Sequence, residues 1–164
     1  SLGYRLELPR AGKFSPEQAR ALGVPVQQWK LLQKGQSVAV EGRTVQPVQV
    51  LGAPRRGLSV VFSGDTAACP GLLQAAQDAD LLLCDATYAL PEQEAQARQW
   101  GHSTFGQSAA LAAQAGAKRL WLTHYSPMIT DPEEYAEQAK GIFPAAECGF
   151  DGKSITLQYE EVQP

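Results

Sequence analysis

The stretch that decides the fold is Leu58-Ser59-Val60-Val61-Phe62-Ser63-Gly64-Asp65-Thr66. Its first five residues are mostly apolar and β-branched, which predicts a buried strand. A small polar turn follows, and Asp65 completes it. Because ligands and reacting groups collect at the carboxyl ends of strands in α/β sheets, Asp65 is the first candidate for a functional residue.

Two further stretches repeat this pattern of an apolar strand that ends in a polar group. Residues 81–84 lead into Asp85, and residues 119–122 lead through Thr123 into His124. Apolar strands separated by helices predict an α/β fold whose sheet is covered on its faces. Cap, proline and glycine signals place the helices at residues 70–79, 91–98, 104–115 and 131–141, and a last strand is expected at residues 155–159.

The first 56 residues differ from the rest of the chain in their pattern of predicted secondary structure. They predict a strand at residues 3–8, two short helices at 16–23 and 26–33, and a hairpin made by 37–40 and 44–51. The first helix begins at Ser15-Pro16, because serine caps a helix and proline suits its first position. We therefore place a boundary near residue 57, between residues 1–56 and residues 57–164.

Composition narrows the class of protein. A chain of 164 residues with 44% hydrophobic residues suits one domain or a large piece of one. No apolar run reaches the roughly 18 residues of a membrane span, and the start does not read as a signal peptide. Three scattered cysteines fit a reducing cytoplasm, and we expect all three to be buried or half-buried. Because residue 1 is serine, we expect the chain to begin at a cleavage point or a truncation.

Charge is distributed unevenly along the chain. Residues 1–56 hold nine basic and three acidic residues, a balance of +6, whereas the remainder carries −9. A chain divided in this way often binds a polyanion through its basic part. An ordinary solvated surface with uneven charge remains the alternative.

Three polar residues are candidates for a functional site, and each of them also has a purely structural interpretation. Asp65 either binds a metal ion that compensates its loss of water, or caps the following helix. His124 is either a ligand exposed at a turn by the Tyr125-Ser126-Pro127 sequence, or a core histidine. His102 lies between a glycine and a helix start, which suits an acid or a phosphate contact. A surface loop histidine is the alternative for His102.

Taken together, these pieces resemble ribonuclease Z, the tRNA 3′-end processing endoribonuclease of the metallo-β-lactamase fold. The resemblance is carried by Ser63-Gly64-Asp65-Thr66, Gly101-His102-Ser103-Thr104 and Leu122-Thr123-His124-Tyr125-Ser126-Pro127. It extends to Gly3-Tyr4-Arg5, Gly12-Lys13-Phe14 and Ala21-Leu22-Gly23-Val24-Pro25, which are similar to an arm that this family inserts. The similarity covers nearly all of the chain.

The resemblance implies a fold and a set of roles. The fold would be the C-terminal half of an αββα sandwich with an inserted N-terminal arm. Asp65 would bridge two zinc ions, His124 would bind one of them, and His102 with Asp85 would serve proton transfer. The arm would grip precursor tRNA away from the cut through five basic residues: Arg10, Lys13, Arg20, Lys30 and Lys34. The complete enzyme would be a cytoplasmic homodimer without a membrane anchor.

Three departures from the family pattern affect these expectations. Asp85 stands where the family usually has glutamate, so we expect the shorter carboxylate to reach His102 less well. The arm has Val26-Gln27-Gln28-Trp29 where a Gly-Pro pair is usual. The His-x-His-x-Asp-His motif of the family has no counterpart in the 164 residues, and two zinc ions need more ligands than Asp65, His124 and His102.

The sequence thus predicts part of a zinc-dependent endoribonuclease that removes 3′ trailers from precursor tRNA. We expect this chain to be inactive alone and to need a separate N-terminal half or a second copy. One alternative is another hydrolase of the same fold, such as a phosphodiesterase or an arylsulfatase-like relative. The other is a non-catalytic fragment that pairs with a separate N-terminal half.

Overall fold

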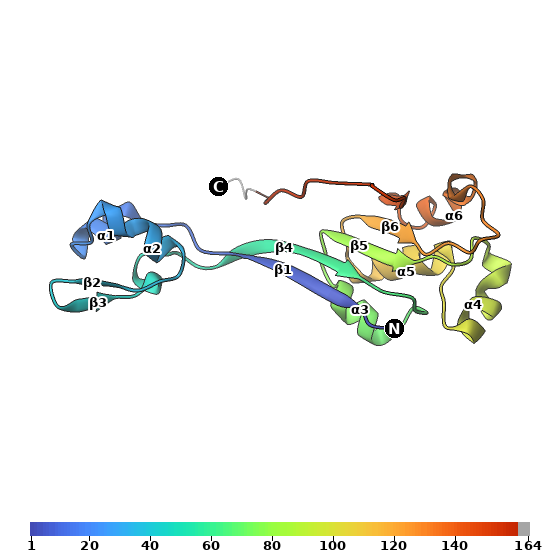
Figure 1. Ribbon diagram of the computed structural model, residues 1–164, viewed down its shortest axis with the longest axis horizontal. Coiled ribbons are helices and arrows are strands. Elements are labelled where there is room, and N and C mark those ends of the chain that lie inside the picture. Colours follow the sequence, from blue (N-terminus) through green and yellow to red (C-terminus); the bar gives the residue numbers. More distant parts are fainter. Residues whose placement is uncertain (161–164) are drawn as a thin grey trace. The chain divides into compact units, whose positions relative to one another are not determined.

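The structure of the protein, a computed structural model, describes residues 1–160 (Figure 1). The chain divides into two compact units. The first combines Ser1–Glu7 with Leu58–Gln158, and the second comprises Leu8–Gly57 with the end of the chain. Within the described residues, no helix is long and apolar enough to cross a membrane.

A five-stranded sheet forms the centre of the first unit, in the order β1-β4-β5-β6-β7. Strands β4 to β7 pair in parallel, and the register sets Asp85 of β5 beside Thr123 of β6. Because the strands are parallel and in register, the polar groups that follow them meet at the carboxyl ends of the strands. The strands are β1 (Tyr4–Arg10), β4 (Arg55–Phe62), β5 (Leu81–Asp85), β6 (Leu120–Thr123) and β7 (Ala146–Cys148).

Helices connect these strands in the order that the sequence predicts. The longest, α5 (Phe105–Ala115), runs alongside β5 and β6 (Figure 1). It begins with the expected capping box of Thr104 and Gln107 and ends at Gly116 in the left-handed conformation. The others are α3 (Pro70–Ala76), η3 (Pro91–Gln93), α4 (Glu94–Trp100), η4 (Pro132–Tyr135) and α6 (Glu137–Lys140).

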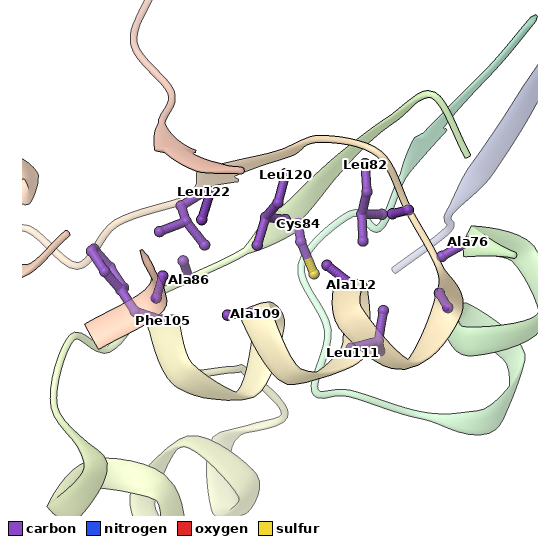
Figure 2. Close-up of a cluster of buried hydrophobic side chains, with 14 of the residues drawn as sticks. Ala76, Leu82, Cys84, Ala86, Phe105, Ala109, Leu111, Ala112, Leu120 and Leu122 are labelled. Atoms are coloured by element: carbon purple, nitrogen blue, oxygen red, sulfur yellow. The ribbon is translucent and has the colours of Figure 1, made fainter. Parts of the chain in front are cut away.

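The core of the first unit lies between one face of the sheet and helices α3, α5 and α6. Figure 2 shows Leu82, Cys84 and Leu120 of the sheet directed towards α5, where small alanines allow close approach. Successive residues of a strand point to opposite faces, so their neighbours face away from these helices. Val61 is fully buried in this core, for example, whereas Phe62 is 37% exposed.

The second unit has a small hydrophobic core of its own, which includes Leu32, Val45 and Val50. Its hairpin turns through Glu41 and Gly42, both with positive φ, as a two-residue hairpin loop requires. The elements are α1 (Pro16–Ala21), η1 (Val26–Gln28), α2 (Trp29–Gln33), β2 (Val38–Val40), β3 (Arg43–Val45) and η2 (Pro47–Gln49).

Three local predictions are wrong. Residues 155–159 form no strand, although they alternate apolar and polar residues, because a strand needs a pairing partner and β7 occupies the place beside β6. The second hairpin strand ends at Val45, since Pro47 starts a 3-10 turn. Cys69 is exposed, whereas Cys84 and Cys148 are buried as expected.

Candidate active site

Four of the predicted site residues meet at the carboxyl ends of the parallel strands. The Nδ1 atom of His102 lies 2.7 Å from Oδ2 of Asp85, and Nδ1 of His124 lies 3.6 Å from the same oxygen. The Nε2 atom of His124 lies 3.5 Å from Oδ2 of Asp65. The two imidazole rings stack with centroids 5.2 Å apart. The sheet therefore brings together residues that are up to 59 positions apart in the sequence.

Asp85 is the centre of this network. Its side chain has no exposed surface, and its carboxylate accepts hydrogen bonds from four protein donors besides His102. A buried carboxylate needs such compensation for the water that it gives up. The four donors are the amide of Thr66 (3.0 Å), the amide of Thr87 (3.0 Å), the hydroxyl of Thr87 (2.9 Å) and the amide of Ser103 (3.2 Å).

The backbone of Asp85 is held as firmly as its side chain. Its amide donates to the hydroxyl of Ser63 at 2.9 Å, and its carbonyl accepts from the hydroxyl of Ser108 in α5. The preceding residue, Cys84, is buried, and burial raises the pKa of its thiol to about 11. Cys84 is therefore a neutral core residue and takes no part in the chemistry.

His102 is held between two helices. Gly101 ends α4 in the left-handed conformation, the amide of His102 donates to the carbonyl of Ala97, and Thr104 caps α5. The glycine thus caps the end of α4. The expectation that the shorter Asp85 would reach His102 poorly is wrong. Turns on both sides place the ring against the carboxylate.

His124 occupies a strained position after β6. Its φ is +61°, a conformation that few residues other than glycine adopt. The next residue, Tyr125, holds this turn, because its hydroxyl contacts the Leu122 carbonyl at 2.5 Å and the Gly149 amide at 2.8 Å. Burial raises the pKa of the Tyr125 phenol well above its usual range, so this anchor stays protonated. The His124 side chain remains 44% exposed.

Asp65 differs from the expectation in its exposure. Its side chain is 58% exposed, so the expected loss of water does not occur in this chain. The capping alternative fails, because α3 begins after Cys69 and has no side-chain cap. Gly64 enables the turn before Asp65: its φ is +63°, and an added Cβ would lie 2.6 Å from the Leu2 carbonyl oxygen.

Asp65 and His124 fit one edge of a zinc site. Tetrahedral zinc with bonds of about 2.0–2.1 Å places its ligand atoms about 3.4 Å apart. The 3.5 Å between His124 Nε2 and Asp65 Oδ2 matches this edge. Both side chains are partly exposed, as the ligands of an open site are.

A second cluster suits a metal ion less well. Atoms of Asp85, His102 and His124 lie within 4.8 Å of one another and are of ligand type. The Asp85 carboxylate, however, already receives five protein donors, which is one more than its four lone pairs accommodate well. We therefore interpret this cluster as the support of the site and not as a metal centre.

A cavity of about 400 Å³ opens beside His124. Trp121 and Phe150 line it, and the ammonium group of Lys153 lies 5.1 Å and 5.4 Å from their ring centroids. Lys153 also pairs with Glu147 at 2.9 Å, and its hydrogen bond lowers the pKa of that carboxyl. The wall of the cavity is thus held by a cation between two aromatic rings.

The predicted RNA-binding residues all belong to the second unit. Lys13, Lys30 and Lys34 are exposed and form no ion pair within residues 1–160. Arg20 is exposed too, with its guanidinium 5.4 Å from the Trp29 ring centroid. Arg10 is half-buried, stacks on Tyr159 at 4.5 Å and donates to the Glu160 carbonyl. Their role in binding RNA stays a prediction.

Sequence reasoning overlooked the hydroxyl residues that support the site. Thr87, Ser63 and Ser103 each bond to Asp85 or to the turn beside it. They stand within or next to the motifs, and this position was the available signal. Most of their partners lie 18 to 37 residues away in the sequence, and only the folded sheet reveals them.

The fold and this site place the chain in a family. A family model described as "Beta-lactamase superfamily domain" matches residues 7–125, and the chain belongs to this family. The family and the parallel sheet with its helices confirm the predicted fold class.

Curated relatives make the resemblance more particular. The chain is 43% identical over 159 residues to ribonuclease Z of Lachnoclostridium phytofermentans, covering 97% of this chain and 52% of that protein. It is 46% identical over 162 residues to ribonuclease Z of Myxococcus xanthus, covering 96% and 52%. The predicted resemblance to ribonuclease Z is confirmed. The chain spans about half the length of these relatives.

A solved structure agrees on the fold. The metallo-beta-lactamase fold protein YhfI from Bacillus subtilis matches with a TM-score of 0.50 and 22% identity, covering 56% of this chain and 37% of that one. At this identity the match concerns the fold alone.

Proposed function

We propose that the chain is the C-terminal part of a zinc-dependent endoribonuclease that removes 3′ trailers from precursor tRNA. Its similarity to ribonuclease Z over 96–97% of its length supports this proposal. The observation that carries it is the strand-end network, in which a buried carboxylate supports two partly exposed imidazoles. This arrangement suits general acid catalysis beside a metal site.

Asp65 and His124 would hold zinc, with Asp65 shared between two ions. When bound, zinc supplies a water-derived nucleophile and neutralises charge on the phosphate. Asp65 is suited to bridging, because its side chain is 58% exposed and its backbone amide is already bonded to the Ser1 hydroxyl at 2.9 Å. The remaining ligands would come from residues outside the described chain, as the share of the relatives' length suggests.

His102 would protonate the leaving group. Cleavage breaks the bond between phosphorus and the 3′ oxygen of the tRNA, and that oxygen needs a proton. Because the Asp85 carboxylate can only accept hydrogen bonds, Nδ1 of His102 is the donor to it. The Nε2 atom then carries the proton that passes to the leaving oxygen. Asp85 stabilises the charged imidazole before this transfer.

The second unit would bind tRNA away from the cut. Its balance of basic residues favours contact with phosphates, as does the exposure of Lys13, Lys30 and Lys34, which have no ion pair in the part of the chain that the structure describes. A hydrolase of the same fold that acts on small substrates needs no such surface. The charge of this unit therefore discriminates between the tRNA-processing proposal and that alternative.

The missing half, or a second copy of the chain, would cover the sheet face opposite the helices. Phe62 is 37% exposed on this face, and Leu83 is half-buried beside it. A sandwich buries such a face against a second sheet. We propose that the complete enzyme is a homodimer and that this chain is inactive by itself.

The test measures both binding and cleavage. The 164-residue chain should bind precursor tRNA with an affinity that falls with salt, and should cleave only after the N-terminal half of the Lachnoclostridium phytofermentans relative is added with zinc. Combined Lys13→Glu and Lys30→Glu should weaken binding at least tenfold. The double variant should also flatten the salt dependence, by about 0.7–0.9 of a log unit for each phosphate that the chain no longer neutralises.

A matched control is Arg119→Glu, which reverses an exposed charge at the amino end of β6, away from the site. It should leave tRNA binding within about twofold. If the double lysine variant binds precursor tRNA as tightly as the unchanged chain, the RNA-binding role is wrong and a small-substrate hydrolase is favoured. EDTA-sensitive cleavage of precursor tRNA by the chain alone would contradict the proposal that its site is incomplete.

A further inference from the structure

We propose that Thr87 is a positioning residue that fixes the tautomer of His124. Its hydroxyl joins His124 to the buried Asp85 and keeps the Nδ1 atom of His124 protonated. The Nε2 lone pair is then left free and directed towards Asp65. The tautomer follows from the two 2.9 Å contacts of the Thr87 hydroxyl, and only its consequence for zinc rests on the function proposed above.

The first step is the position of the Thr87 hydroxyl. Its oxygen lies 2.9 Å from Oδ1 of Asp85 and 2.9 Å from Nδ1 of His124. Both are hydrogen-bond distances. The hydroxyl therefore has two partners, although it carries a single proton.

The second step assigns that proton. The Asp85 carboxylate only accepts, so a separation of 2.9 Å from the hydroxyl oxygen requires the hydroxyl to donate to it. The same oxygen must then accept from His124, which places a proton on Nδ1. The reverse assignment would leave two oxygen acceptors in contact with no proton between them, beside a side chain that is fully buried.

The third step concerns the freedom of each partner to move. The Thr87 amide donates to the same Oδ1 atom at 3.0 Å, so backbone and hydroxyl together lock the threonine against Asp85. The amide of Ser126 donates to the Thr87 carbonyl at 3.1 Å, which ties the turn after His124 to this residue. The hydroxyl therefore meets His124 from a fixed direction.

The two histidines thus share one anchor through different links. His102 bonds to Asp85 directly at 2.7 Å, whereas His124 reaches it through Thr87. Nδ1 is thus the bonded atom in both rings, and Nε2 is the atom left for other partners. Ligand histidines commonly donate their other ring N–H to a carboxylate or another acceptor, which fixes their orientation. Here a threonine hydroxyl is that acceptor.

The test reads the tautomers by nitrogen-15 NMR of the full chain labelled at histidine. The chain has two histidines, and a His102→Gln variant assigns their signals. In its neutral form, each ring should carry its proton on Nδ1. A free imidazole side chain prefers the proton on Nε2, so the signature is distinctive.

Two variants of Thr87 separate positioning from general structure. Thr87→Val keeps the branched shape without the hydroxyl, and should move the His124 proton mainly to Nε2. Thr87→Ser keeps the hydroxyl and should keep the proton on Nδ1. His102 bonds to Asp85 directly, so its signals should not change in either variant, and they report whether the site remains folded.

A second readout is a titration with zinc of the chain combined with the N-terminal half of the Lachnoclostridium phytofermentans relative. Thr87→Val should weaken binding at His124 about tenfold or more, and Thr87→Ser by less than about twofold. A wild-type His124 protonated on Nε2 overturns the proposal, as does a Thr87→Val chain that keeps its proton on Nδ1. If Thr87→Val does not fold, the wild-type and Thr87→Ser spectra still decide. Failure of this combination to bind zinc would count against the metal role and leave the tautomer result standing.

Discussion

The two units of this protein organise their polar residues in opposite ways. At the strand ends of the first unit, the buried Asp85 receives five donors at 2.7–3.2 Å. In the second unit, Lys13, Lys30 and Lys34 lie exposed around a small core, without ion pairs in residues 1–160. The polar residues of the first unit act through directed hydrogen bonds to a buried carboxylate, and those of the second unit act through exposed charge.

This difference determines how each unit responds to substitution. Removing one partner from a buried network leaves the others unsatisfied, so the effects are large and non-additive. Exposed charges are solvated and screened by salt, so each contributes little to stability and acts mainly on a charged partner. We therefore expect stability to depend on the first unit and electrostatic affinity on the second.

The largest effect is expected from Asp85→Asn. The amide turns a donor towards groups that themselves donate, so the unfolding free energy should fall by about 2–4 kcal/mol. Urea unfolding followed by circular dichroism measures this, with the exposed Asp151→Asn as the control. Lys30→Glu should change stability by no more than about 0.5 kcal/mol. Equal losses of unfolding free energy for Asp85→Asn and Lys30→Glu would contradict this difference between the two units.

A smaller effect is expected where the backbone turns before Asp65. Gly64→Ala combines a φ of +63° with a contact of 2.6 Å to the Leu2 carbonyl oxygen. Gly35→Ala in the second unit has a similar φ of +83° but nothing within 4 Å of the added Cβ. The left-handed conformation alone costs about 1–2 kcal/mol.

Thermal unfolding should show Gly64→Ala less stable than Gly35→Ala by at least about 1 kcal/mol, because the added methyl group meets the Leu2 carbonyl. If the two alanine variants are equally destabilised, the packing of Gly64 against residues 1–2 contributes nothing.

The smallest effect compares one helix cap from each unit. Thr104 caps α5 from a buried position and shares a capping box with Gln107, whereas Ser15 caps the six-residue α1 from a half-buried one. Thr104→Ala should cost about 1–2 kcal/mol and Ser15→Ala about 0.5–1 kcal/mol.

The conservative variant Thr104→Ser should recover most of the stability at the first of these caps, because it restores the acceptor oxygen. A larger effect for Ser15→Ala than for Thr104→Ala would mean that the cap in the second unit carries more of the stability than its exposure indicates.

Much of the fold follows from local sequence signals. The three apolar strands β4, β5 and β6, the capping box of α5 and the glycine that ends this helix were predictable, because each depends on neighbouring residues. Residues 155–159 show where such signals fail. Their alternation is typical of a strand, but pairing depends on a partner strand that the local sequence does not specify.

The candidate site divides in the same way. The sequence alone determined which residues carry the chemistry: Asp65, Asp85, His102 and His124 stand after strands or before a helix in motifs that resemble a known family. Only the tertiary structure decided that Asp85 reaches His102 and that Thr87 links Asp85 to His124. The reason is that these contacts join three separate segments, namely the end of β5, the turn after β6 and the loop between α4 and α5. The strand register and the position of these helices bring them together, and no one segment does so alone.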